Sequence, residues 1–342
     1  MILCNTKTLN APLTGVQRYV QEILRHAPAN AITTIRPGTW CKGPLGHFWE
    51  QAALPLRALG KTLFSPANTG PLLVSKQMVT LHDLATFDTP EDFSANFRAY
   101  YTWLLPKLLP RVAHVITVSE FTRQCAIDRF GLNPGKITAI PLGVNHQHFY
   151  PRSAAEIATT RQNYGIAAPY VLALSSLSPR KNLPRLLQAW QQALPQLPAN
   201  LELLLAGGAG AANVLKSTNL AQLPARTRLL GRIEDAQLPA LLSGAEAFVF
   251  PSLYEGFGLP PLEAMACGAP CLVTNAASVP EVVGAAALTF SPHNVAEMAE
   301  MLVKIATQPA LARQLKAQGL AQAQAFQWQK TANKTLEILR NI

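Results

Sequence analysis

Short apolar runs alternate with helical segments along this chain. The run Ala247–Phe250 has the length of a strand, and a turn rich in glycine and proline follows it. Pro261 then opens a helix that Gly268 ends, and a second apolar run, Cys271–Val273, closes the unit. Strand, helix and strand at this spacing predict a parallel βαβ unit.

The same alternation recurs on both sides of a stretch at 146–168 that is rich in Pro, Ala, Gly and Thr. The composition of that stretch predicts a linker, and the alternation on both sides of it predicts two α/β domains. Further strands are predicted at Met1–Cys4, Leu63–Ser65, Val79–Leu81, Val115–Val118, Ile137–Ile140, Tyr170–Leu174, Leu201–Leu205 and Arg228–Gly231. Helical spacing is found at Val16–Leu24, 91–110, Leu183–Leu194 and 294–342.

Composition supports two globular domains. The chain has 342 residues, of which 49% are hydrophobic and 14% are charged. No apolar run reaches the roughly 20 residues of a membrane span, and no signal peptide is visible, so we expect a cytoplasmic protein. The five cysteines form no CxxC pair, so we expect buried thiols and no metal site.

The net charge of +10 favours anionic partners. Sugar nucleotides and anionic lipid head groups fit this charge, and the latter would place the protein at the inner face of the cytoplasmic membrane. No long basic run and no nucleic-acid motif occurs, so we expect no nucleic-acid partner. A diffusely basic surface without a partner is the alternative.

Two carboxylates stand beside the predicted helix of the βαβ unit. Glu255 lies in the loop at the carboxyl end of a strand, where open α/β sheets bind ligands. Glu263 is expected in the first helical turn, near the free N–H groups of the helix N-terminus. Such a pair suits a ligand rich in hydroxyls. An isolated surface acid near a helix start is the alternative, which is favoured for Glu263 alone but not for the pair.

Two cations, Arg180 and Lys181, stand where another predicted strand gives way to a helix. This arrangement predicts a diphosphate site, with a solvated basic turn as the alternative. The glycines at 207–210 follow a strand as in dinucleotide-binding proteins, but Asn213 stands where the third glycine of that fingerprint belongs. The incomplete fingerprint therefore makes a nicotinamide-dependent dehydrogenase only a distant possibility for the function of this chain.

Three candidates lie in the first half. Gly15 is predicted at a helix N-terminus, either as an anion site or as an ordinary turn. His82 follows a strand and could hydrogen-bond a substrate, with Asp83 fixing its tautomer; a capping Asp beside an incidental His is the alternative. Ser119 reads as a helix N-cap. The aromatic residues at 93–105 are expected mainly in the core, with an exposed face near an acceptor or membrane as the alternative.

The segment from Glu255 to Glu263 resembles the E-x7-E motif of retaining glycosyltransferases of family 4, also called glycosyltransferase group 1. The loop TGVQRYVQEIL, HDL after a strand, the turn PLGV and the RKN segment are similar to that family as well. The resemblance implies an α/β fold of GT-B architecture, with two Rossmann-like, doubly wound parallel-sheet domains facing across a cleft. It implies an acceptor-binding domain at 1–150, a nucleotide-sugar domain at 151–325 and a terminal helix at 326–342 that crosses back.

The resemblance also implies roles for single residues. Arg180 and Lys181 would grip the donor diphosphate, and Glu263 would bind the ribose. His82 would lie over the donor sugar, and Gly15 would face the phosphates, although Gln17 departs from the small residue usual there. The sugar hydroxyls would be held by Glu255 with the backbone N–H groups of Phe257, Gly258 and Leu259, the nucleobase would meet Arg232, and Ser119 would line the cleft.

The implied reaction is metal-independent transfer of a hexose with retention, without a cofactor. Mannose from GDP-mannose is the favoured donor, and UDP- or dTDP-sugars stay open. The implied acceptor is a glycan or polyprenyl-diphosphate-linked glycan in bacterial surface polysaccharide or lipopolysaccharide synthesis. A non-catalytic relative would lose the cations or the carboxylates, and all of these are present.

Overall fold

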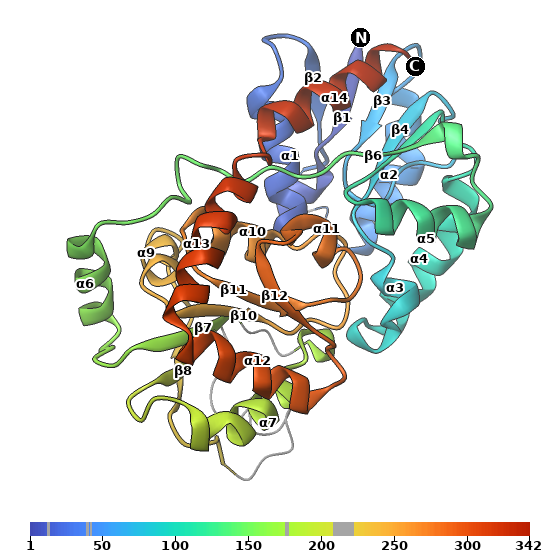
Figure 1. Ribbon diagram of the computed structural model, residues 1–342. Helices are drawn as coiled ribbons and strands as arrows, with labels where there is room; N and C mark the ends of the chain where they lie inside the picture. The colour runs from blue at the N-terminus through green and yellow to red at the C-terminus, as the bar shows by residue number, and fades with distance from the viewer. Residues whose placement is uncertain (12–13, 39–40, 42, 175–177, 208–221) are drawn as a thin grey trace. The chain divides into compact units, whose positions relative to one another are not determined.

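The computed structural model describes residues 1–342 except 12–13, 39–40, 42, 175–177 and 208–221. The chain divides into two compact units, shown in Figure 1. The first unit comprises Met1–Gly143 together with Phe326–Ile342, and the second comprises Val144–Ala325. The division therefore falls at Gly143, before the boundary at 150 that the sequence suggested.

The first unit contains a parallel sheet with helices on its faces. Its strands, in the order β2-β1-β3-β4-β5-β6, are β1 Ile2–Asn5, β2 Ile32–Ile35, β3 Thr62–Ser65, β4 Gln77–Leu81, β5 His114–Thr117 and β6 Ile137–Ala139. Its α-helices are α1 Gly15–His26, α2 Pro44–Arg57, α3 Ala85–Asp88, α4 Ala95–Leu108, α5 Glu120–Phe130 and α14 Trp328–Arg340. Short 3-10 helices span Lys7–Asn10, Pro90–Asp92 and Pro134–Lys136.

The second unit repeats this plan. Its strands, in the order β12-β11-β10-β7-β8-β9, are β7 Tyr170–Leu174, β8 Glu202–Ala206, β9 Thr227–Gly231, β10 Ala247–Phe250, β11 Cys271–Thr274 and β12 Ala287–Phe290. Its described α-helices are α6 Ala154–Asn163, α7 Leu183–Ala193, α9 Leu238–Ser243, α10 Leu259–Ala266, α11 Val279–Val283, α12 Val295–Thr307 and α13 Pro309–Ala323. Short 3-10 helices span Pro179–Lys181 and Leu194–Gln196.

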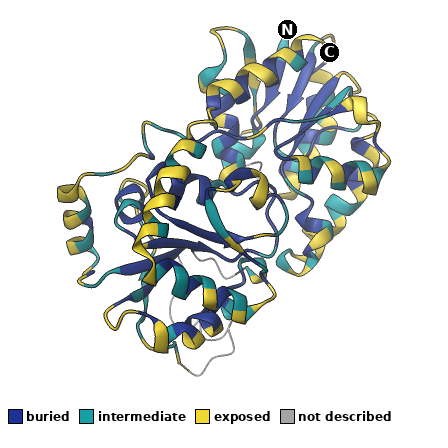
Figure 2. Cartoon of the chain, in the orientation of Figure 1, coloured by how far each residue is buried: buried dark blue, intermediate teal, exposed yellow. Residues whose placement is uncertain are grey.

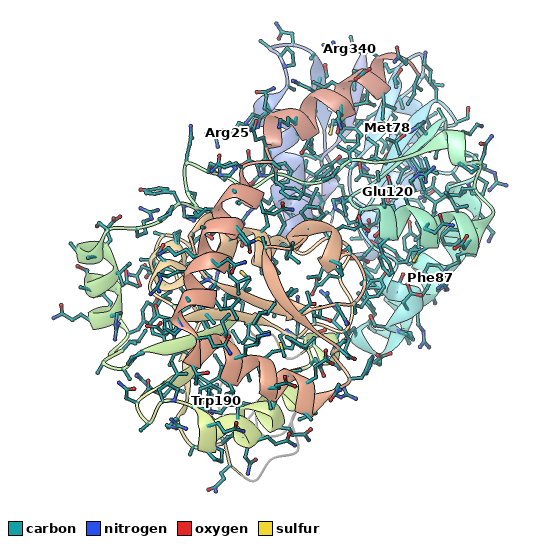
Figure 3. All side chains as sticks on the ribbon, in the orientation of Figure 1. Arg25, Met78, Phe87, Glu120, Trp190 and Arg340 are labelled. Carbon is teal, nitrogen blue, oxygen red and sulfur yellow. The ribbon has the colours of Figure 1, made fainter. Side chains whose placement is uncertain are left out.

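Both sheets are buried on their two faces, which explains the continuous apolar runs in the sequence. In Figure 2 the central strands are dark blue, whereas much of the outward surface of the helices is yellow. In β10, Ala247 and Val249 join the core under α7, while Phe248 and Phe250 stack with ring centroids 6.2 Å apart. Trp190 of α7, labelled in Figure 3, is fully buried in that core.

Each sheet reverses its strand order at one point. In the second unit the chain winds outward in both directions from the adjacent strands β7 and β10, and in the first unit from β1 and β3. At such a reversal, the loops that follow the two adjacent strands lead away in opposite directions and leave a crevice at the carboxyl ends of the strands. Ligands of open α/β sheets bind in this crevice. We call these two places the switch points of the units.

The structure corrects several expected element boundaries. The edge strands β2 and β12 were not predicted from the sequence. Helix α4 lies within the segment predicted at 91–110 and runs through Pro106 to end at Leu108. The expectation that the aromatic residues at 93–105 lie mainly in the core was wrong: Tyr100 and Tyr101 are half-buried against the core, Phe97 and Trp103 are exposed, and the core positions are taken by Leu104 and Leu105.

Candidate functional site

The switch point of the second unit brings together three predicted residues. Arg180 and Lys181 lie in the 3-10 helix after β7, and Glu255 lies in the loop after β10. Lys181 Nζ lies 2.6 Å from Glu255 Oε1, and Arg180 NH1 lies 3.2 Å from Glu255 Oε2. Two cations therefore share one carboxylate, and a net positive charge remains at the place where an anionic ligand would bind.

Glu255 is ionised in this setting. Burial by itself would raise the pKa of Glu255, because only 9% of the residue is exposed. The charges of Lys181 and Arg180, with hydrogen bonds from Lys181 and Ser252, instead hold this pKa below its ordinary value. The Ser252 hydroxyl donates to Oε1 at 2.5 Å. Both carboxylate oxygens thus have cationic partners from the loop after β7.

Three polar residues that the sequence interpretation did not assign hold these loops in place. Asn182 has left-handed backbone geometry, with φ at 57°, and its side-chain amide donates to the carbonyls of Pro251 at 3.0 Å and Pro292 at 2.7 Å. The Ser278 hydroxyl lies 2.9 Å from the carbonyl oxygens of both Glu255 and Phe257. Ser252 is the third. In the sequence, the position of Asn182 directly after two cations is the signal that could have indicated its role in holding the loops.

Helix α10 begins at Leu259, earlier than predicted, because Gly258 acts as its N-cap. Gly258 has φ at +113°, a conformation that a residue with a side chain adopts only with strain. The first turn contains no acidic residue, so Glu263 lies in the second turn and not in the first, as the sequence suggested. Phe257, Gly258 and Leu259 do form the loop-to-helix junction beside Glu255.

Glu263 is nevertheless buried, with 6% of the residue exposed. It lies one helical turn before Cys267, whose thiol pKa is raised to about 12 by burial and by the Glu263 charge. Arg232 is exposed in the turn that follows β9.

His82 lies in the first unit, at the carboxyl end of β4. Its Nε2 lies 2.8 Å from the carbonyl oxygen of Pro66, so Nε2 carries the proton and Nδ1 is the acceptor nitrogen. Burial lowers the pKa of His82 to about 4, so the ring is neutral at pH 7. The expectation that Asp83 fixes this tautomer was wrong: Asp83 Oδ1 accepts from the backbone N–H of Ala85 at 3.1 Å.

Gly15 opens α1, as predicted. Gln17, the residue that departs from the family pattern, is buried and has a local function. Its Oε1 accepts from the backbone N–H of Thr14 at 3.0 Å, and its amide donates to Thr8 in the loop after β1. Gln17 therefore ties the helix N-terminus to that loop. Ser119 caps α5 by accepting from the N–H of Thr122 at 3.1 Å, which confirms its predicted N-cap role.

The switch point of the first unit contains a buried charge network. Glu50 of α2 lies 2.7 Å from Lys7 Nζ, and it accepts hydrogen bonds from Asn5 at 2.7 Å and Thr69 at 3.1 Å. His47 Nδ1 lies 3.2 Å from the same Lys7 nitrogen. Burial by itself would raise the pKa of Glu50, but the Lys7 charge and the hydrogen bonds from His47 and Lys7 lower it to about 2.

This low pKa predicts a loss of stability in acid. A carboxyl with a lowered folded-state pKa stabilises the fold above its unfolded value of 4.5, and this stabilisation disappears as the pH falls toward about 2. The free energy of unfolding should therefore drop by roughly 3 kcal/mol from this group across that window. Urea titrations at stepped pH should show a much flatter acid limb for Glu50→Gln. An equally steep limb in Glu50→Gln would contradict the assignment, and Lys7→Met should move the loss to higher pH.

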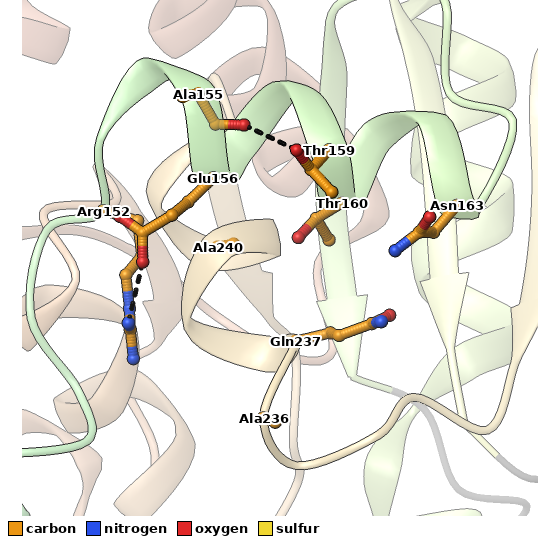
Figure 4. A pocket seen from close by; sticks show the side chains of 9 residues that line it. All are labelled: Arg152, Ala155, Glu156, Thr159, Thr160, Asn163, Ala236, Gln237 and Ala240. Atoms are coloured by element: carbon orange, nitrogen blue, oxygen red, sulfur yellow. Dashed lines mark hydrogen bonds and ion pairs between the residues drawn. The ribbon is translucent and has the colours of Figure 1, made fainter.

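A shallow pocket of the second unit contains none of the predicted donor residues. It has a volume of about 350 Å³ between α6 and α9, and Figure 4 shows its lining side chains. Arg152 NH1 lies 3.0 Å from Glu156 Oε1, and the Thr159 hydroxyl donates to the carbonyl of Ala155. These polar groups bond to one another and to the backbone at the start of α6. We therefore interpret the pocket as a junction between helices.

One sequence expectation, the incomplete glycine fingerprint, concerns residues for which no structure is described. The glycine-rich loop at 208–210, with Asn213 after it, lies outside the described ranges. Within the described ranges, no group of three or more His, Cys, Asp or Glu side chains is placed to hold a metal ion. The described helices also include none that is long and apolar enough to cross a membrane.

The two doubly wound parallel sheets, with two cations beside one carboxylate at a switch point, define an α/β protein of two Rossmann-like units. Family models match both parts of the chain: "Glycosyl transferases group 1" matches residues 157–322, and "Glycosyltransferase Family 4" matches residues 60–148. The chain belongs to this glycosyltransferase family, and its fold is the GT-B architecture.

Individual relatives agree with this assignment. The chain is 34% identical over 273 residues to O-antigen chain mannosyltransferase B of Escherichia coli, covering 78% of this chain and 70% of that protein. It is 32% identical over 283 residues to the serotype-specific mannosyltransferase WbdA of Escherichia coli, but it spans only 34% of that longer protein. Sucrose-phosphate synthase of Thermosynechococcus elongatus has the same fold, with a TM-score of 0.74 and 22% identity over 99% of this chain and 98% of that one.

Proposed function

We propose that this glycosyltransferase transfers a hexose, with retention at the anomeric carbon, from a nucleotide sugar to a glycan or lipid-linked glycan acceptor. Mannose from GDP-mannose is the proposed donor, and bacterial surface polysaccharide synthesis, of the O-antigen kind, is the proposed setting. The names of its relatives support both choices, because the two described above are mannosyltransferases and one of them acts on O-antigen chains.

The observation that carries the proposal is the pairing of Arg180 and Lys181 with Glu255 at a switch point. When the bond to the donor sugar breaks, negative charge grows on the departing diphosphate. Cations that are already fixed in place stabilise this charge without reorganisation. Arg180 and Lys181 are fixed by Glu255 and by the loop contacts, so they can supply this stabilisation without a metal ion.

The remaining residues have proposed roles around the same ligand. Glu255 and the backbone N–H groups of Phe257, Gly258 and Leu259 would bind the sugar hydroxyls. Glu263 would bind the ribose, and Arg232 the nucleobase. His82, neutral at pH 7, would accept a sugar hydroxyl at Nδ1 because Pro66 holds the proton on Nε2. Gly15 at the start of α1 would face the phosphates, and Ser119 would line the acceptor side.

Nucleotide binding tests the donor site directly. Among GDP, UDP, ADP, dTDP and NAD, we expect GDP to stabilise the protein, by about 2.7 kcal/mol at ~100 times its dissociation constant. Glu263→Gln should weaken GDP binding about tenfold or more, because its neutral amide replaces a charged acceptor for the ribose hydroxyls. Calorimetric titration of parent and variant measures this. Glu281→Gln, an exposed acid at the start of α11, is the matched control.

The nucleotide that binds distinguishes the proposed donor from its alternatives. Stabilisation by UDP or dTDP alone would change the donor, whereas stabilisation by NAD alone would overturn the transferase site. Once the donor is identified, the one-bond C1–H1 coupling at the new anomeric centre distinguishes retention from inversion; the H1–H2 coupling is small in both anomers of mannose and cannot do so. A transfer rate that falls on adding EDTA, and returns with a divalent cation, would overturn metal independence.

A further inference from the structure

The first unit contains an open groove that none of the proposed roles uses. Its inner end is a cavity of about 390 Å³ at the switch point, lined by the loops after β1 and β3, with Lys7, Asn10 and Thr69. Its outer end is a cavity of about 650 Å³ between α2 and α4. Gly43, His47 and Phe97 line both cavities, so the two cavities adjoin, and we call them together the groove.

The outer end of the groove is lined by aromatic rings. Phe48, Phe97, Tyr100 and Trp103 all contribute, and Phe97 stacks on Tyr101 with ring centroids 4.3 Å apart and an angle of 22°. Phe48 is 72% exposed and Trp103 is 47% exposed. Large exposed rings gathered around one cavity indicate a binding surface, since burial would otherwise be favourable.

The chemistry of this lining selects a class of ligand. Among the described residues that line the outer cavity, none is an Asp, Glu, Lys or Arg, and only aromatic rings and Pro44 present large apolar faces. Neutral hydrogen-bonding groups stand between the rings: Gln51, Ser94 and Asn96. Flat rings interleaved with neutral polar groups fit pyranose rings, whose C–H faces lie on aromatic faces while their hydroxyls hydrogen-bond at the edges. A prenyl or acyl chain, by contrast, could offer no hydrogen bond to these polar side chains.

We propose that this groove binds the acceptor glycan over several consecutive sugar residues. The inner cavity would take the terminal sugar that receives the new bond, and the aromatic outer cavity would take the sugars that precede it. The ligand class is therefore an uncharged oligosaccharide. This inference rests on the proposed function only in naming the bound glycan as the acceptor.

The polar inner end suits a terminal sugar. Lys7 and His47 face this cavity, and their positions are fixed by the buried Glu50 through the contacts at 2.7 Å and 3.8 Å. Thr69 also lines it and donates to Glu50. Fixed polar groups can select among the hydroxyls of one sugar, whereas stacking on rings tolerates many sugars. The inner end of the groove would thus select a particular terminal sugar, whereas the outer end would accept many sugars.

Direct binding tests the inference without requiring transfer. The probes are monosaccharides and linear oligomers of mannose, glucose, rhamnose and N-acetylglucosamine, with farnesyl phosphate as the lipid probe. We expect one oligosaccharide series to bind more tightly than its monosaccharide. Phe48→Ala and Trp103→Ala should each weaken the oligomer by about fivefold to tenfold and leave the monosaccharide unchanged. Leu56→Ala is the matched control, because Leu56 lies on the same helix as Phe48 and is also 72% exposed.

Three outcomes would overturn the inference: no oligomer binds more tightly than its monosaccharide, both aromatic variants bind oligomers like the parent, or the aromatic variants lose farnesyl phosphate and not the oligomer. Titration of each variant with GDP separates this test from that of the proposed function. A parent that binds oligomers through Phe48 and Trp103 but transfers no sugar would uphold the groove and overturn the transfer reaction.

Discussion

Replacing Arg180 and Lys181 together with alanine should slow sugar transfer by about a thousandfold or more. Each cation is fixed beside Glu255 where charge would develop on the departing diphosphate, and loss of one such stabilising group costs about a hundredfold to a thousandfold. The two effects should not add fully, because both cations act on the same charge. The measurement is kcat for transfer with saturating donor, together with the dissociation constant of the nucleotide diphosphate.

The double variant also leaves Glu255 buried without its cations. Stripping a buried carboxylate of its partners costs about 3 kcal/mol of stability, so lost activity alone could reflect unfolding. Arg180→Lys and Lys181→Arg keep the charges and should retain the fold. Arg228→Ala is the matched control: Arg228 pairs with Glu202 at 3.3 Å near the amino ends of β8 and β9, at the opposite edge of the same sheet. A folded double variant that transfers sugar at the parental rate would exclude the proposed mechanism.

Most of the fold could be predicted from the sequence because central parallel strands are buried on both faces and appear as apolar runs. The strands that escaped prediction, β2 and β12, lie at sheet edges. Their sequences, ITTI and ALTF, include partly exposed threonines, so the apolar signal is diluted. The boundary of α10 was missed for a local reason, since the left-handed Gly258 caps a helix whose first residues include two prolines.

The sequence indicated Arg180, Lys181 and Glu255 separately as candidate residues, but it could not predict that they pair. Lys181 and Glu255 are far apart in the sequence, and they meet because β7 and β10 are neighbours at the point where the strand order reverses. That adjacency is a property of the packed sheet. His82 shows the converse: Asp83 is its neighbour in the chain, yet successive side chains at the end of a strand point to opposite sides. The backbone carbonyl of Pro66, from the loop after β3, therefore holds the ring.

The structure explains why the PLGV turn has a glycine, Gly143, which the sequence motif by itself did not. A Cβ at Gly143 would lie 2.2 Å from the backbone nitrogen of Trp328 and 2.7 Å from the carbonyl carbon of Gln327. The Thr331 hydroxyl donates to the carbonyl of Pro141 at 2.8 Å, which fixes the start of α14 against the same turn. The backbone of the terminal helix therefore occupies the space that a side chain would need.

Gly143→Ala should accordingly destabilise the first unit by about 3 kcal/mol or more, because neither of the two backbones can yield without breaking contacts. The effect should extend to His82. The ring of the buried Trp328 lies 6.3 Å from that of Tyr19, and the Tyr19 ring lies 4.9 Å from that of His82 in an edge-on contact. Displacement of α14 should thus lower transfer activity even at temperatures where the variant remains folded.

Urea unfolding followed by tryptophan fluorescence, with transfer assays below the transition, measures both effects. Gly135→Ala is the matched control, because its Cβ would meet only the side-chain oxygen of Asn133 at 3.3 Å. It should change the free energy of unfolding by less than about 1 kcal/mol. A Gly143→Ala variant as stable as Gly135→Ala would show that α14 can move away from the turn. The contact between the two backbones would then contribute little to holding Tyr19 and His82 in place.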